Sequence, residues 1–146
     1  MKRVGLWALG IGVLLSVGPL TVERGYAGDS DGATKCTQAT LKGRYLFATT
    51  GTLAAGVFAR AGYRIFYGDG TGTIIATTTV NGVVTAKDAQ SDLSYTVDND
   101  CTGSFTVLSV NAIAEIFVAP DGEEMVVIQT NTGQSDAHSS PRVGPE

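Results

Sequence analysis

The chain has 146 residues, which suits one small domain, because ordinary domains run ~100–200 residues each. Charged residues are 16% of the sequence, against ~25% in typical soluble proteins, and the formal net charge is −4. Neither nucleic acid nor an anionic membrane surface is expected as a partner, because phosphate binding requires clustered cations. One histidine and two cysteines exclude a zinc finger and a cluster of histidine ligands, so we expect no metal and no cofactor.

Residues 1–27 have the pattern of an export signal. A positive start, Met1-Lys2-Arg3, precedes an apolar stretch over 4–22, and Gly25-Tyr26-Ala27 is a small-x-small cleavage motif. The alternative is an uncleaved membrane anchor, since 19 apolar residues come near the ~20 needed to span a bilayer. We expect cleavage after Ala27 and a secreted or periplasmic protein with no stable membrane insertion.

The two cysteines, Cys36 and Cys101, are expected to form a disulfide, because an even pair in an oxidising compartment normally does so. Loop-closure entropy across their 65-residue separation predicts a stabilisation of roughly 4 kcal/mol. The alternative, a redox-active pair, usually has the close spacing of C-x-x-C.

From residue 43 onward, short runs rich in β-branched and aromatic residues alternate with turn signals, which is typical of an all-β domain. Eight strands are predicted, over 43–50, 59–67, 73–80, 83–87, 92–97, 103–110, 112–119 and 124–130. The Asn81-Gly82 pair between the third and fourth runs is the strongest hairpin signal in the chain.

Sequential strands with short links predict a single eight-stranded antiparallel up-and-down β-barrel, of calycin or allene-oxide-cyclase type, because closure removes exposed sheet edges. We place an N-terminal arm at 28–40, the barrel at 41–132 and a polar, disordered tail at 133–146. A barrel of this size holds packed side chains or one small ligand.

Four stretches carry a resemblance to a group of small secreted bacterial proteins of unknown function: LKGRYLF at 41–47, FYGDGTGTI at 66–74, YTVDNDCTGSFTV at 95–107 and IFVAPDGEEMVVIQTNTG at 116–133. The resemblance implies a small closed barrel, similar at fold level to allene oxide cyclase, dirigent and lipocalin-like proteins. No catalytic motif of those families is carried over, and a fold by itself assigns no function.

Two loops imitate ligand-binding motifs. Gly68, Gly70 and Gly72 suggest a phosphate loop, but Thr73 stands where the third glycine belongs and a strand follows instead of a helix. The Asp98-Asn99-Asp100 sequence starts like a calcium loop, but its last ligand position is Ser109. Ordinary turns are the better interpretation of both.

Glu115 is the candidate catalytic residue, because it interrupts an apolar strand and shares a face with Ile113 and Phe117. If that face lines the barrel, Glu115 is a poorly solvated carboxylate that Arg44 or Arg64 could accompany. The alternative is a solvent-facing side chain or a structural ion pair.

The strands also carry an aromatic set that suits either an apolar ligand pocket or an ordinary core. The candidate ligand-binding residues are Tyr45, Phe47, Tyr63, Arg64, Tyr95 and Phe117.

Three functions follow as hypotheses. The first is a secreted binding protein for a small hydrophobic or aromatic molecule. The second is a cofactor-free cyclase or isomerase that uses a carboxylate inside the barrel as acid or base. The third is a non-catalytic structural or protein-interaction module. Oligomeric state is left open.

Overall fold

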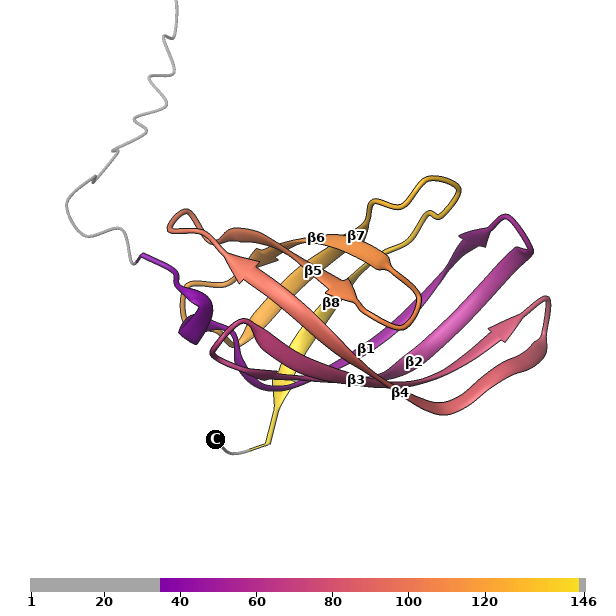
Figure 1. Cartoon of the computed structure of the whole chain (residues 1–146), viewed down its shortest axis with the longest axis horizontal. Coiled ribbons are helices and arrows are strands. Elements are labelled where there is room, and N and C mark those ends of the chain that lie inside the picture. The colour runs from indigo at the N-terminus through magenta and orange to yellow at the C-terminus, as the bar shows by residue number, and fades with distance from the viewer. Residues whose placement is uncertain (1–34, 145–146) are drawn as a thin grey trace, which may run out of the picture. The chain divides into compact units, whose positions relative to one another are not determined.

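The computed structural model describes residues 35–144, which form a closed barrel of eight antiparallel strands in sequence order (Figure 1). The strands are β1 (Lys42–Leu53), β2 (Gly56–Tyr67), β3 (Thr71–Val80), β4 (Val83–Val97), β5 (Thr102–Val107), β6 (Ala112–Val118), β7 (Glu124–Gln129) and β8 (Ala137–Val143). The predicted all-β, eight-stranded barrel is confirmed. The expected export signal and its cleavage site lie outside the described residues.

Two parts of the strand prediction are wrong. Two predicted strands are one strand, and one strand was not predicted, so the total of eight is still right. The runs 83–87 and 92–97 belong to one strand, β4, which continues through a polar stretch. Its pairing with β3 shifts register between Ala76 and Thr78, and Asp88 has a φ of 47°. Such a bulge makes a continuous strand difficult to predict from the sequence, because it interrupts the alternation of inward and outward side chains.

The tail predicted to be disordered instead supplies β8. This strand pairs with β7 from Glu124↔Pro141 to Ile128↔Ala137 and so completes the barrel. Its side chains are mostly polar, and the composition therefore resembled a solvated tail. When the inward side chains of a strand are polar, apolar residues do not recur at every second position, and the usual sequence signal of a strand is absent.

The β1–β8 seam is the weakest-paired junction of the wall. Backbone partners are Arg44↔Val143 and Tyr45↔Arg142 at one end and the isolated bridge Thr52↔Ser135 at the other. Side chains from the two strands meet between these points, and the polar network described below lies there.

One end of the barrel is closed and packed, and we call it the closed end. The Phe66 ring lies 5.5 Å from the Tyr45 ring and 4.9 Å from the Tyr95 ring, both edge-on. A short 3₁₀ helix, η1 (Gln38–Thr40), lies at this end. Cys36 is fully buried and forms the predicted disulfide with Cys101, with Cα atoms 5.0 Å apart.

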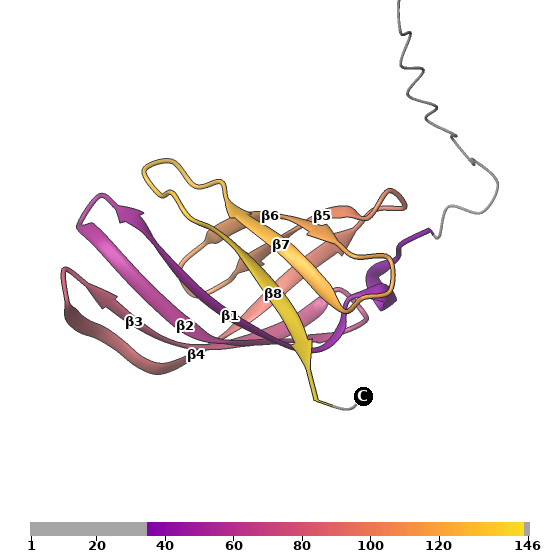
Figure 2. The same cartoon turned by 180° about the vertical axis from the view of Figure 1, so that it is seen from behind.

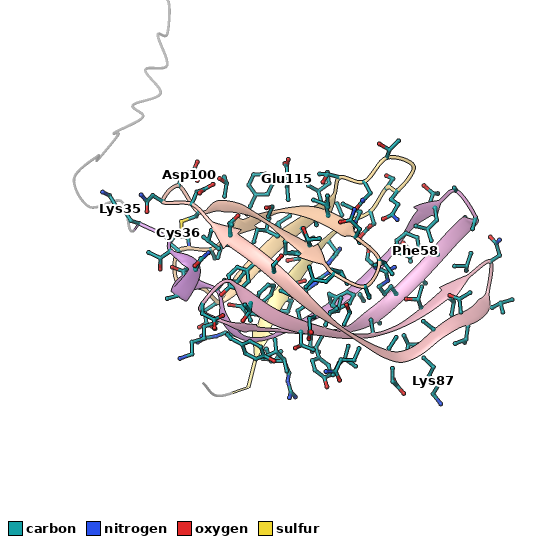
Figure 3. All side chains as sticks on the ribbon, in the orientation of Figure 1. Lys35, Cys36, Phe58, Lys87, Asp100 and Glu115 are labelled. Carbon is teal, nitrogen blue, oxygen red and sulfur yellow. A yellow bond between two sulfur atoms is a disulfide. The ribbon has the colours of Figure 1, made fainter. Side chains whose placement is uncertain are left out.

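The opposite end is open. Figures 1 and 2 show the β1–β2 and β3–β4 hairpins extending past β5 and β6. In Figure 3, Phe58 and Lys87 mark the extended hairpins, whereas Cys36 and Asp100 mark the closed end. The strands that reach farthest therefore enclose only half of a barrel.

Strong curvature of the wall explains some of the glycines. At Gly62 a Cβ would overlap the Ile75 carbonyl oxygen on the neighbouring strand, and at Gly103 it would overlap that of Thr96. Backbones approach this closely only where no side chain intervenes, so these glycines allow the sheet to bend into a small barrel. No helix among residues 35–144 is long and apolar enough to cross a membrane.

Candidate functional site

A buried arginine organises the middle of the barrel. Arg64, on β2, is only 4% exposed. Its Nη1 donates to Ser140 Oγ at 3.2 Å, and its Nη2 lies 3.2 Å from His138 Nε2. The guanidinium also stacks on aromatic faces, 4.0 Å from the Phe47 ring centroid and 4.8 Å from that of Phe105. Cation–π contact and hydrogen bonds together offset part of the cost of burying this charge.

Asp136 is the carboxylate of the interior. Thr49 Oγ1 donates to its Oδ2 at 3.1 Å, and His138 Nδ1 lies 3.3 Å from the same oxygen. Arg64 Nη2 approaches Nε2 of the same ring, so the imidazole lies between the guanidinium and the carboxylate. Burial raises the pKa of Asp136, but hydrogen bonds from His138 and Thr49 outweigh it and hold the pKa below its ordinary value. Asp136 is therefore ionised at neutral pH.

A second arginine faces the same interior. Arg60, on β2, donates from Nε to Thr78 Oγ1 at 3.0 Å, and its guanidinium lies 5.4 Å from the Phe58 ring centroid. Burial lowers the pKa of Arg60, and the charge of Asp136 raises it. For Arg64, burial lowers the pKa to about 9; Asp136 raises it and the like charge of Arg60 lowers it further.

The polar network made by Thr49, Arg60, Arg64, Asp136 and His138 carries an unbalanced charge. Its two guanidinium groups outnumber its one carboxylate. The whole chain, by contrast, has a formal net charge of −4. The interior is thus positive inside an acidic protein.

A cavity of about 270 Å³ lies at the open end, next to this network. Its apolar lining comes from β1, β3, β4 and the end of β5: Leu53, Ile74, Ala76, Val80, Ala86, Ala89, Val107 and Val110. Its polar lining consists of Arg60, Thr78, Thr85, Gln90, Ser91 and Ser109. A mostly apolar surface with a few polar groups is the usual make-up of a small-molecule site.

Tyr45 and Tyr95, two of the residues predicted to bind a ligand, belong to the closed end. Tyr45 Oη donates to the Gly122 carbonyl at 2.5 Å, and burial raises the pKa of Tyr45 to about 12. Tyr95 Oη lies 2.9 Å from the Leu41 carbonyl and 3.0 Å from that of Gln38. Both hydroxyls therefore hold loops of the protein itself, and neither residue lines the open-end cavity.

Glu115 and Phe117 lie on the outer face, so of the two orientations left open for Glu115 the structure has the solvent-facing one. The inward residues of β6 are Ala112, Ala114, Ile116 and Val118. Because β6 is apolar on both faces, period two leaves its orientation ambiguous. The small inward Ala114 pairs directly with the bulky Phe105 of β5, which fills the space.

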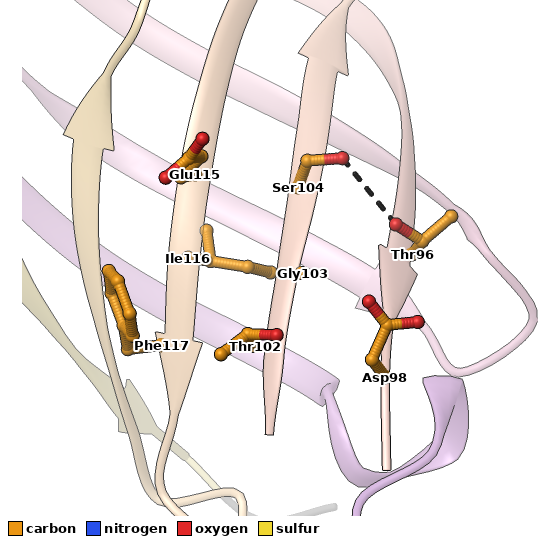
Figure 4. A pocket seen from close by; sticks show the side chains of 8 residues that line it. All are labelled: Thr96, Asp98, Thr102, Gly103, Ser104, Glu115, Ile116 and Phe117. Atoms are coloured by element: carbon orange, nitrogen blue, oxygen red, sulfur yellow. Dashed lines mark hydrogen bonds between the residues drawn. The ribbon is translucent and has the colours of Figure 1, made fainter. Parts of the chain in front are cut away.

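Glu115 instead borders an outer groove of about 420 Å³ over β4, β5 and β6 (Figure 4). The groove is also lined by Phe117 and by Thr96, whose Oγ1 lies 3.4 Å from Ser104 Oγ. Neither arginine suggested as a partner of Glu115 fills that role, because Arg64 bonds inside the barrel and Arg44 stacks 4.7 Å from the Tyr63 ring. Tyr63 thus lies on the outer side of the wall.

Two of the predicted ligand-binding residues, Phe47 and Arg64, do meet inside the barrel. Thr49 and Arg60 were not singled out within their strands. Asp136, His138 and Ser140 were missed because they fall in the segment expected to be disordered. A usable signal was present: these three polar residues alternate with period two, as the inward face of a strand does.

Comparisons of the chain with protein-family models, with curated proteins and with solved structures find no match. The resemblance to small secreted bacterial barrels therefore stays a prediction.

Proposed function

We propose that this protein binds a small hydrophobic or aromatic molecule in the cavity at the open end of the barrel. The observation that supports this most is the contrast between the two ends. The closed end is filled by its own side chains, whereas the open end has a cavity of about 270 Å³ with a largely apolar lining. At ~30 Å³ per water molecule this is the space of roughly nine waters, which suits a ligand of on the order of ten non-hydrogen atoms.

A cofactor-free enzyme has less support from the residues present. Glu115, the carboxylate on which that hypothesis depended, is outside the barrel. Asp136 is inside, but its lowered pKa makes it a weak general base, because the best catalytic pKa lies near the working pH. Its Oδ2 also already accepts a hydrogen bond from Thr49.

The proposed site of action is outside the cytoplasm, in the secreted or periplasmic space. A disulfide-bonded barrel is compatible with an extracellular location, because disulfides persist in oxidising compartments. The export signal expected from the sequence supports the same compartment.

The test is a titration with N-phenyl-1-naphthylamine, a neutral aromatic probe whose fluorescence rises in apolar surroundings. The protein is the chain as secreted by its host, in which the signal has been processed. We expect saturable binding to the wild type. Ala86→Phe places a ring in the cavity and is expected to weaken binding at least tenfold, about 1.4 kcal/mol.

The matched control is Ala59→Phe, which adds the same ring at an exposed position of β2 that is not in the cavity lining. This variant is expected to bind within about twofold of the wild type. Absence of saturable binding to the wild type, or equal losses in both variants, would contradict the proposed site.

A further inference from the structure

The charge inside the barrel points to the chemistry of the ligand. Burying a cation without a matching anion is costly, because the low-dielectric interior replaces its hydration poorly. The two terminal nitrogens of Arg64 have partners in Ser140 and His138, and its guanidinium lies against two aromatic faces, whereas its buried Nε has no hydrogen-bond partner among residues 35–144. The one interior carboxylate of the network, Asp136, is linked to Arg64 through His138.

Arg60 is only partly buried and is held differently. Its Nε is fixed by Thr78, and Phe58 lies beside its guanidinium. Among residues 35–144, its two terminal nitrogens have no hydrogen-bond partner. Arg60 also lines the open-end cavity, which Arg64 does not. A guanidinium fixed at one edge, with its other edge at a cavity, is positioned to donate two parallel hydrogen bonds to a carboxylate.

We propose that the ligand is an amphipathic anion, a small aromatic or aliphatic carboxylic acid, and that Arg60 binds its carboxylate. This inference rests on the proposed function and specifies the ligand class for the same cavity. The carboxylate would balance the excess of guanidinium groups over carboxylates in the polar network. The apolar body would lie against the apolar lining of the cavity, to which Ile74, Ala76 and Val107 contribute.

The negative charge of the ligand distinguishes a carboxylic acid from a neutral molecule in a binding experiment. A neutral molecule of the same shape would leave the terminal nitrogens of Arg60 without their charged partner. Hydrogen bonds between two charged groups are stronger than those that involve a neutral partner. We therefore expect the protein to prefer an acid over its neutral isostere by about tenfold or more.

The experiment compares 2-naphthoate with 2-naphthamide, which share a ring system and differ in charge. Binding of each is measured by calorimetry to the wild type, to Arg60→Gln and to Arg44→Gln. Both variants remove one positive charge, but Arg44 stacks on Tyr63 at the outer face. The wild type and Arg44→Gln are expected to favour the acid at least tenfold. Arg60→Gln is expected to bind both compounds with affinities within about twofold of each other.

Equal affinities for the acid and the amide in the wild type would overturn the inference and leave the proposed cavity intact. A tenfold preference that persists in Arg60→Gln would also overturn it, because another group would then supply the charge. If the wild type binds neither compound, nor N-phenyl-1-naphthylamine, the proposed function itself fails. The wild-type comparison needs no variant, so a folding defect in Arg60→Gln does not remove the test.

Discussion

The closed end and the open end of this barrel differ in how they are packed. At the closed end, Phe66 is packed between Tyr45 and Tyr95, and both tyrosine hydroxyls bond to backbone carbonyls. At the open end, the same β2 strand presents Arg60 beside a cavity. The packed half satisfies its own polar groups, whereas the open half leaves a cation and apolar surface available.

If the proposed function holds, stability and binding are separated along the barrel axis. Changes at the closed end should lower the free energy of unfolding without altering ligand affinity. Changes at the open end should do the reverse. The polar network between the two ends should affect both properties.

Phe66→Ala should give the largest loss of stability. Phe66 is 1% exposed and contacts two aromatic rings, and truncation of a buried phenylalanine costs ~3–5 kcal/mol. Urea denaturation measures this loss, and probe titration of the folded variant should give wild-type affinity. A loss under about 1 kcal/mol would show that the closed end is not the stabilising core.

Removing the disulfide should cause the second-largest loss of stability. The Cys36→Ser, Cys101→Ser double variant loses a cross-link that closes 65 residues, worth ~4 kcal/mol by loop-closure entropy and often less in practice. Thermal unfolding with and without a reducing agent measures it in the wild type, and the double variant should not respond to the reductant. Ligand affinity that falls tenfold on reduction would contradict the separation of the two ends.

Asp136→Asn should affect both properties in opposite directions. At neutral pH it should cost ~2–3 kcal/mol of stability, because hydrogen bonds to a charged acceptor are lost. The same change removes a negative charge near Arg60, so 2-naphthoate should bind about threefold more tightly. Tighter acid binding with unchanged amide binding would sharpen the account, and weaker acid binding would argue against it.

The pH dependence of that variant has a defined sign. The pKa of Asp136 is lowered in the folded state, so its contribution is present above the unfolded value of ~3.9 and is lost as pH falls through the folded value. The wild type should therefore lose stability below about pH 4 more steeply than Asp136→Asn. Asp69→Asn is the control for removing a carboxylate that is outside the barrel interior. Asp69 also has a lowered pKa, but it is exposed and lies in a turn.

Tyr45→Phe should have the smallest effect, ~1 kcal/mol, because it leaves the Gly122 carbonyl without its donor. The Tyr45 pKa of about 12 is higher than the ordinary value, so the unfolded chain ionises first and stability falls as pH rises from about 10 to 12. Absorbance titration of the tyrosines should show a late step in the wild type that is missing in Tyr45→Phe.

The barrel could be predicted from the sequence because its turn signals and β-branched runs are local features. The Asn81-Gly82 turn and the glycines between β2 and β3 are of this kind. The disulfide followed from the compartment and the even number of cysteines. These features depend on the chain itself and on its immediate neighbours in sequence.

The site could not be predicted in the same way, because it depends on which face of each strand turns inward. β6 is apolar on both faces, so the sequence did not determine the orientation of Glu115. The inward positions of β8 are polar, and Asp136 directly precedes this strand, so Asp136 and His138 were not recognised as interior residues. Only closure of β8 onto β1 and β7 brings them to Arg64.

The most direct test of the account is to map the bound ligand by NMR, using the ¹H–¹⁵N spectrum of the labelled protein titrated with 2-naphthoate. The account predicts that the largest shifts fall on the amides of Ala76, Ala86 and Val107 and on the Arg60 side chain, with little change around Tyr45 and Tyr95. Shifts concentrated at the outer groove beside Glu115 and Phe117, or at the closed end, would contradict it.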